Sequence, residues 1–220
     1  MKKAAIITGA GRGLGSHIAV YLAQKNYDLV MHYNTSENAA KALAEELSQK
    51  YKIKCFTMQQ DFSKTKNYGK LIGLALEKLP HIALLINNAS IFNREAFLET
   101  NFDTFFESIK VNLIAPLFLT QAFVKKAKQG CVINILDAYI QSTYSPYFIY
   151  MLSKKALAIF TEMAAKETNH IRINAICPHI VIPKNKLEES MPKRTSLQDL
   201  LETIWQVAGN QYQNGEVIFV

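Results

Sequence analysis

Short apolar runs that alternate with segments of helical period constrain the fold of this chain more than any other feature. Several runs, such as Ile82-Ala-Leu-Leu-Ile86, are apolar throughout, which is typical of strands covered on both faces by helices. The alternation predicts an α/β fold with a doubly wound parallel sheet, formed by one domain over residues 1–220. The predicted strands are Ala4–Thr8, Asp28–Tyr33, Ile53–Met58, Ile82–Asn87, Cys131–Leu136, Ile171–Cys177 and Glu216–Val220. The predicted helices are Gly13–Lys25, Glu37–Lys50, Lys66–Leu79, Phe102–Gln129, Tyr147–Asn169 and Ser196–Gly209.

Composition and charge argue against several classes of protein. With 49% hydrophobic residues the chain can bury one sizeable core, yet no apolar run reaches the length of a membrane span. The apolar segment behind Lys2 and Lys3 breaks at Gly9 and Arg12, which is too early for a signal peptide, so we expect a cytoplasmic protein. The net charge of +7 comes without a nucleic-acid-binding motif. We therefore expect no nucleic acid and no membrane as partner, and we expect the charge to attract an anionic small molecule.

The three cysteines, Cys55, Cys131 and Cys177, each lie in an apolar run rich in β-branched residues. They are far apart in the sequence and lack the spacing of metal ligands. We therefore expect three buried thiols in strands, with no disulfide framework and no bound metal.

A glycine-rich turn follows the first predicted strand and reads Thr8-Gly-Ala-Gly-Arg-Gly-Leu-Gly15. Glycines at this position let the backbone turn tightly and let a pyrophosphate approach the amide groups at the helix N-terminus. The Gly-Lys-Ser/Thr of nucleotide triphosphatases is absent. The turn therefore predicts a dinucleotide site, and the residues expected to contact it are Gly9, Arg12, Gly13, Leu14 and Gly15.

The end of the second predicted strand bears on which dinucleotide is bound. NAD-selective sites usually place a carboxylate there, whereas this chain has Tyr33 and Asn34. Thr35, Ser36 and Arg12 offer hydroxyls and a cation that suit a 2′-phosphate. Glu37 is assigned to the first turn of the next helix, which Ser36 is expected to cap. We therefore predict NADPH as cofactor, with contacts from Tyr33, Asn34, Thr35 and Ser36.

Polar residues also follow the third and fourth predicted strands. Asp61 either lies at the adenine edge of the cofactor or is a helix N-cap before Ser63, and both alternatives stay open. The fourth strand ends in a segment expected beside the cofactor, and the contacts predicted there are Asn88, Ala89 and Ser90. Asn112 lies within a long apolar helical segment, where its amide needs a hydrogen-bonding partner.

Tyr150 and Lys154 lie four residues apart, so on a helix they share one face. An ammonium group beside a phenol favours the phenolate and is expected to lower the pKa of Tyr150. A phenol with a lowered pKa suits a general acid in the reduction of a polar double bond. Because such pairs also arise by chance in unrelated helices, this pair predicts a catalytic role only in combination with the other motifs.

Taken together, these motifs resemble the short-chain dehydrogenase/reductase family. The matching residues are Thr8-Gly-x-x-x-Gly-x-Gly15, Asn87-Asn-Ala89, Asn112, Tyr150-x-x-x-Lys154 and Pro178. The resemblance runs from about residue 3 to residue 220 and implies a Rossmann-type sheet of seven parallel strands in the order 3-2-1-4-5-6-7. It also implies that Tyr150 is the catalytic acid, that Lys154 and Pro178 contact the cofactor, and that Asn112 kinks its helix and holds a water. Similar enzymes are commonly dimers or tetramers, so a homo-oligomer is expected.

Asp137 departs from the common family pattern, which has Ser thirteen residues before the catalytic Tyr. It resembles the pteridine reductases and dihydromonapterin reductases, which place Asp at this position. Phe92 and the dipeptide His32-Tyr33 match the same subgroup. The resemblance implies that Asp137 orients a pterin and relays a proton, while Phe92 stacks on the pterin face. The predicted substrate contacts are Ser90, Phe92, Asp137, Tyr150 and His179.

The sequence therefore predicts an NADPH-dependent reductase that acts on a dihydropterin or dihydrofolate. One alternative is a carbonyl reductase of the same family, acting for instance on 3-oxoacyl thioesters. A second alternative is a non-catalytic NADP(H)-binding sensor. His179 is as readily a solvent-facing loop residue as a substrate contact, and the segment Ile180–Lys193 is expected to cover the substrate.

Overall fold

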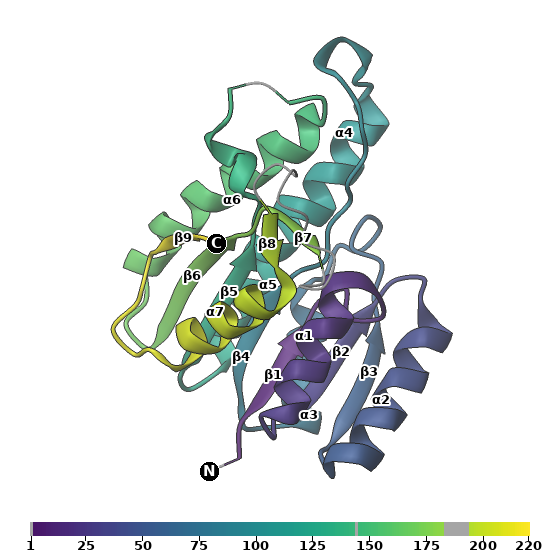
Figure 1. Ribbon diagram of the computed structural model, residues 1–220, viewed down its shortest axis with the longest axis vertical. Coiled ribbons are helices and arrows are strands. Elements are labelled where there is room, and N and C mark those ends of the chain that lie inside the picture. Colours follow the sequence, from purple (N-terminus) through teal and green to yellow (C-terminus); the bar gives the residue numbers. More distant parts are fainter. Residues whose placement is uncertain (1, 144, 183–193) are drawn as a thin grey trace.

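The computed structural model describes residues 2–143, 145–182 and 194–220, and this part of the chain forms a three-layer α/β fold (Figure 1). Seven parallel strands make one sheet in the order β3-β2-β1-β4-β5-β6-β9. The strands are β1 (Ala4–Ile7), β2 (Asp28–Tyr33), β3 (Cys55–Gln59), β4 (Ile82–Asn87), β5 (Gly130–Ile135), β6 (Ile171–Cys177) and β9 (Val217–Phe219). The predicted fold class and strand order are confirmed.

Helices cover both faces of the sheet because each buried strand supplies apolar side chains to both (Figure 1). In β1, Ala5 and Ile7 belong to one hydrophobic core, while Ala4 and Ile6 belong to the other. The first core is completed by helices α1 (Gly13–Gln24), α2 (Glu37–Tyr51) and α7 (Leu197–Gly209). The second core is completed by α3 (Gly69–Lys78), α5 (Ala115–Lys126) and α6 (Phe148–Lys166).

The long predicted helix Phe102–Gln129 is interrupted in the structure. It consists of α4 (Phe102–Ile109), a π-helical turn η2 (Lys110–Ile114) and α5. In the π turn, the amide of Ala115 donates to the carbonyl of Lys110, five residues earlier. Asn112 lies in the middle of this turn, and π turns are sites at which helices kink, so the structure supports an irregularity at this residue while the kink itself stays a prediction.

Four short elements were not predicted from the sequence. They are the 3₁₀ turns η1 (Phe97–Glu99) and η3 (Ala138–Gln141) and the paired strands β7 (Ile180–Ile182) and β8 (Arg194–Ser196). Each spans three or four residues, which is too short for a hydrophobic period to be recognised.

The three cysteines lie in strands, as predicted. Cys131 and Cys177 are buried, but Cys55 is only partly buried because β3 is an edge strand of the sheet. The prediction of a buried thiol is therefore wrong for Cys55. In the described part of the chain, we find no helix with the length and hydropathy needed to cross a membrane.

The strand order reverses beside β1, whose neighbours β2 and β4 are reached by crossovers in opposite directions. In open α/β sheets, ligands bind at such a switch point, outside the carboxyl ends of the strands. The loops after β1, β2, β4, β5 and β6 meet at this edge, and they carry most of the predicted site residues.

Candidate active site

The glycine-rich turn between β1 and α1 is built on backbone conformations and contacts that favour glycine. Gly9 and Gly13 have φ angles of +66° and +58°, in the left-handed region. Gly15 is buried, and a Cβ atom there would overlap the carbonyl oxygen of Gly9 and lie 2.7 Å from Nδ2 of Asn88. The turn therefore packs directly against the loop that follows β4.

Hydrogen bonds fasten these two loops together. The hydroxyl of Thr8 accepts from the amides of Asn88 and Ala89 at 2.9 and 3.0 Å. In return, Nδ2 of Asn88 donates to the carbonyl oxygens of Thr8 and Gly9 at 2.9 and 3.3 Å. Residues from both sides of the switch point thus form one rigid cradle.

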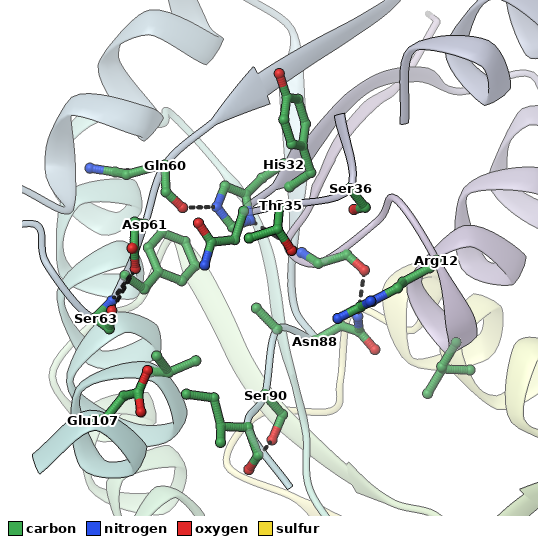
Figure 2. A pocket seen from close by; sticks show the side chains of 18 residues that line it. Arg12, His32, Thr35, Ser36, Gln60, Asp61, Ser63, Asn88, Ser90 and Glu107 are labelled. Atoms are coloured by element: carbon green, nitrogen blue, oxygen red, sulfur yellow. Dashed lines mark hydrogen bonds between the residues drawn. The ribbon is translucent and has the colours of Figure 1, made fainter. Parts of the chain in front are cut away.

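A cavity of about 360 Å³ lies beside this cradle (Figure 2). Arg12 and Ser36 lie on one side of it, and Asp61 and Glu107 lie on the other. The predicted cofactor contacts that line it are Gly9, Arg12, Leu14, Tyr33, Asn34, Thr35, Ser36, Asp61, Asn88, Ala89 and Ser90. Gly13 and Gly15 do not line it, and their positions indicate that they shape the turn.

Ser36 does not cap α2 as predicted. It occupies the position before Glu37, but its hydroxyl makes no capping bond to the described residues of the helix. Its side chain instead packs against Gly11, where an added Cβ atom would overlap the Ser36 hydroxyl. The placement of Glu37 in the first helical turn is confirmed, and its carboxylate pairs with Lys41 at 2.6 Å.

Asp61 lines the cavity and also stabilises the turn that follows it. Its carboxylate accepts from the amide and the hydroxyl of Ser63 at 2.9 and 2.7 Å. The hydrogen bond from the Ser63 hydroxyl is the main cause of the lowered pKa of Asp61. The predicted helix cap at Asp61 is wrong, because the bonded residues form a turn and the next helix, α3, begins only at Gly69; the adenine contact stays a prediction.

His32 also lines the cavity, although it is not among the predicted site residues. Its Nδ1 accepts from the amide of Gly9 at 3.2 Å, so Nε2 carries the proton and donates to the carbonyl of Gln60 at 2.8 Å. The ring stacks on Phe62 with centroids 4.2 Å apart. Burial lowers the pKa of His32 to about 4 and keeps the ring neutral. The sequence feature that could have indicated this role is the position of His32, one residue before the end of an apolar strand.

A second cavity of about 210 Å³ adjoins the first. The two share Leu14, Asn88 and Ser90, so they form one continuous crevice along the strand ends. The predicted residues that line the second cavity are Asp137, Tyr150, Lys154, Pro178 and His179. No sequence motif marks the remaining wall residues, which are Gln60, Phe62, Ser63, Ile91, Glu107, Val111, Ile135, Leu136 and Val181.

Asp137, Tyr150 and Lys154 meet at this second cavity. The hydroxyl of Tyr150 donates to Oδ2 of Asp137 at 3.0 Å. The other carboxylate oxygen of Asp137 accepts from the amide of Tyr139 at 2.8 Å, which fixes the carboxylate at the start of η3. Nζ of Lys154 donates to the carbonyl of Ile135 at 2.8 Å and lies 5.6 Å from the centre of the Tyr150 ring.

The expected lowering of the Tyr150 pKa by Lys154 is wrong for this structure. Burial raises the pKa of Tyr150, and the charge of Asp137 and its hydrogen bond raise it further. The reason is geometric, because the phenol faces the carboxylate while the ammonium group points to the carbonyl of Ile135. Burial also lowers the pKa of Lys154 to about 8, against the opposing charges of Asp137 and Cys177.

Asn112 is fully buried, and its side chain holds the loop after β4. Its Oδ1 accepts from the amide of Ile91 at 2.8 Å and from the hydroxyl of Ser90 at 3.1 Å. Its Nδ2 donates to the carbonyl of Ile91 at 2.9 Å. The predicted need for a partner is confirmed, and the predicted water at this residue stays a prediction.

The two remaining substrate-contact predictions lie near Tyr150. Phe92 is exposed, and its ring meets the ring of Tyr150 edge-on with centroids 4.6 Å apart. His179 lines the second cavity, and its ring lies against Tyr139 with centroids 5.9 Å apart. The segment expected to cover the substrate is described only as far as Ile182, and its remainder lies outside the described residues.

The amino-acid sequence of this chain is similar to those of known proteins. Residues 3–192 match the family described as short chain dehydrogenase. A diacetyl reductase [(S)-acetoin forming] from Staphylococcus epidermidis is 30% identical over 213 residues, which cover 92% of this chain and 80% of that protein. An uncharacterised oxidoreductase, YmfI from Bacillus subtilis, is 30% identical over 186 residues, which cover 82% of this chain and 76% of that protein.

Solved structures are similar in fold. The crystal structure of acetoin dehydrogenase YohF from Salmonella typhimurium has a TM-score of 0.87 at 23% identity, and the match covers 100% of this chain and 94% of that chain. At this identity the likeness shows the fold alone. None of the relatives named here is described as acting on a pterin.

Proposed function

The chain belongs to the short-chain dehydrogenase family, and from that premise we propose that it is an NADPH-dependent reductase that converts a dihydropterin to a tetrahydropterin. It is an oxidoreductase of a family that uses a nicotinamide cofactor. The observation that carries the proposal is the carboxylate of Asp137, which lies in the second cavity at 3.0 Å from the hydroxyl of Tyr150.

The residues that line the crevice support binding of a dinucleotide with a 2′-phosphate. The glycine-rich turn brings Gly9, which has no side chain, to the cavity wall, as close approach of a pyrophosphate to the backbone requires. Arg12, Thr35 and Ser36 supply a cation and two hydroxyls near the end of β2, where a 2′-phosphate would be held. The carboxylate of Glu37 is engaged by Lys41. These residues support NADPH over NADH.

The residues of the second cavity suit the reduction of a ring C=N bond. NADPH, when bound, supplies the hydride that goes to the ring carbon. Tyr150 donates the proton that the ring nitrogen needs; its raised pKa keeps the hydroxyl protonated at neutral pH, and it also makes this group a weaker acid than a free phenol. Asp137 accepts hydrogen bonds from the N–H groups of a pterin, which a neutral Ser could not match in strength. Lys154 supplies a buried positive group beside the phenol ring.

The test is NADPH consumption by the purified protein with dihydrobiopterin, dihydromonapterin, dihydrofolate, diacetyl and a 3-oxoacyl thioester. The proposal expects the highest kcat/KM with one of the dihydropterins, and a higher kcat/KM with NADPH than with NADH. Turnover of the ketones alone would contradict the pterin assignment. Tight NADPH binding without any turnover would favour the non-catalytic sensor.

A carbonyl reductase is the second candidate, and the relative named as a diacetyl reductase favours it. The variant Asp137→Ser separates the two candidates, because a ketone needs only a neutral donor whereas a pterin presents donors to a carboxylate. We expect this variant to lose pterin reduction by at least about tenfold, as the loss of one charged hydrogen bond implies. An Asp137→Ser protein that reduces dihydropterins as well as the parent would favour the ketone.

The outer faces of α5 and α6 support the expected homo-oligomer. Phe118, Ile159 and Met163 are 43%, 58% and 64% exposed, and the helices border an apolar groove of about 350 Å³. A second copy of the chain packed on this face would bury these side chains.

Met163→Glu should therefore shift the protein to a smaller assembly in analytical ultracentrifugation, while Glu162→Lys, one residue away, should leave the assembly unchanged. A parent that sediments as a monomer would contradict the oligomer.

A further inference from the structure

Phe92 and Tyr147 form an aromatic stack next to Tyr150. Their ring centroids lie 4.2 Å apart, with an angle of 16° between the planes. Phe92 remains 57% exposed although one of its faces packs on Tyr147. The opposite face of Phe92 is therefore open, and the ring meets Tyr150 at 83°, edge-on.

The backbone around Phe92 is fixed on both sides. The preceding residue, Ile91, is held at its amide and its carbonyl by the side chain of Asn112. Three residues after Phe92, the amide of Glu95 donates to Pro146, and its carbonyl accepts from Phe148, both at 3.0 Å. The Phe92 loop is thus bound to the segment that contains Tyr147, so the stack joins two anchored loops.

Tyr147 also connects the stack to the reacting group. It directly precedes α6 and lies three residues before Tyr150, so the two are about one helical turn apart on one side. A change in the Tyr147 ring would therefore move the open face of Phe92 relative to the phenol of Tyr150. The Tyr147 ring packs on the covered face of Phe92, so it would influence the distance between Phe92 and Tyr150 without contacting a ligand on the open face.

We propose that Tyr147 is a positioning residue that supports Phe92 as a platform for a flat conjugated heterocycle. The bound ring would add a third layer to the stack, on the open face of Phe92, and so present its edge to Tyr150 and Asp137. This inference rests on the proposed reduction of a pterin. Parallel offset stacking is a favourable arrangement for such rings, whereas a small acyclic ketone has no ring face to stack.

The experiment compares Tyr147→Ala, Tyr147→Leu and Tyr147→Phe with the parent. Two measurements are made: the KM and kcat for dihydrobiopterin with NADPH, and calorimetric binding of oxidised biopterin to the full chain saturated with NADP⁺. We expect the Ala and Leu variants to raise KM and weaken biopterin binding about three- to tenfold, from the size of a stacking contact. The effect on kcat should be smaller, and Tyr147→Phe, which keeps the flat ring, should restore the parent values. The Leu variant keeps the test available if the Ala variant unfolds.

Tyr212→Ala serves as the matched control, because Tyr212 is 87% exposed and outside both cavities. Its KM should equal that of the parent. Parent-like biopterin binding in folded Ala and Leu variants would overturn the platform while leaving pterin reduction in place. A parent that reduces no dihydropterin would contradict the proposed function. The biopterin titration alone would then show whether Tyr147 supports Phe92 as a platform. A parent that binds no biopterin would overturn the platform, whereas the proposed function is decided by the turnover of dihydropterins.

Discussion

The phenol of Tyr150 is the residue on which proton transfer depends. Its hydroxyl is within hydrogen-bonding distance of Asp137, and its pKa is raised, so it carries its proton at neutral pH. Tyr150→Phe removes this donor and little else, and we expect kcat to fall by a factor of about 10²–10⁴. NADPH affinity, measured by fluorescence titration, should stay within about twofold of the parent. Parent-like turnover by the variant would remove Tyr150 from the mechanism.

At the same scale, the sequence could place the reacting groups but not their protonation. Tyr150 and Lys154 are spaced for one helix face, and Asp137 follows a strand. These features were enough to predict that the three residues lie together, and all three line the second cavity. The direction of the Tyr150 pKa shift depends on burial and on which neighbour the hydroxyl faces, and neither is visible in a spacing. The dipeptide His32-Tyr33 indicates a subgroup of the family, but the place of the His32 ring in the cavity wall depends on its contacts with Gly9 and Gln60, which the sequence does not show.

At the scale of elements, long periodic segments were predictable, whereas their interruptions depended on distant contacts. The apolar period of Phe102–Gln129 favoured one helix, but a π turn divides it at Asn112. The partner that satisfies Asn112 is the backbone of Ile91, which is 21 residues earlier and in another element. Only a tertiary contact could therefore show how the amide is used.

The strand–turn–helix unit of β1 and α1 gives a prediction at this scale. Gly15→Ala places a methyl group against the carbonyl of Gly9 and the amide of Asn88, so the cradle must open. We expect a stability loss of about 1–3 kcal/mol, as for other overpacked sites, together with at least a tenfold weaker NADPH affinity. Gly209→Ala is the control, because an added Cβ there has no neighbour within 4 Å. Thermal unfolding and NADPH titration of both variants check this, and equal behaviour would contradict the packing argument.

At the scale of the whole molecule, the alternation of apolar runs predicted a parallel sheet, and the family resemblance implied its strand order, which then located the crevice. The crevice walls could be predicted where a motif marked a strand end, as at Arg12 or Pro178. They could not be predicted where a wall comes from a helix packed across the crevice. Glu107 in α4 is such a residue, because its nearness to the cavity depends on how α4 lies over the sheet.

Folding stability should depend on pH through His32, which joins the turn after β1 to the ends of β2 and β3. Its pKa is lowered from 6.5 to about 4 in the folded chain, so between these values the unfolded chain binds more protons. The stabilisation is therefore full above pH 6.5 and is lost as the pH falls toward 4, by at most about 3 kcal/mol. Asp28, whose pKa is lowered from 3.8, acts at lower pH and does not overlap this window. Urea unfolding of the parent from pH 7 to pH 4.5 should show the loss, and His32→Gln, which has no titrating ring, should flatten it. A parent with constant stability over this range would show that the imidazole is not held neutral.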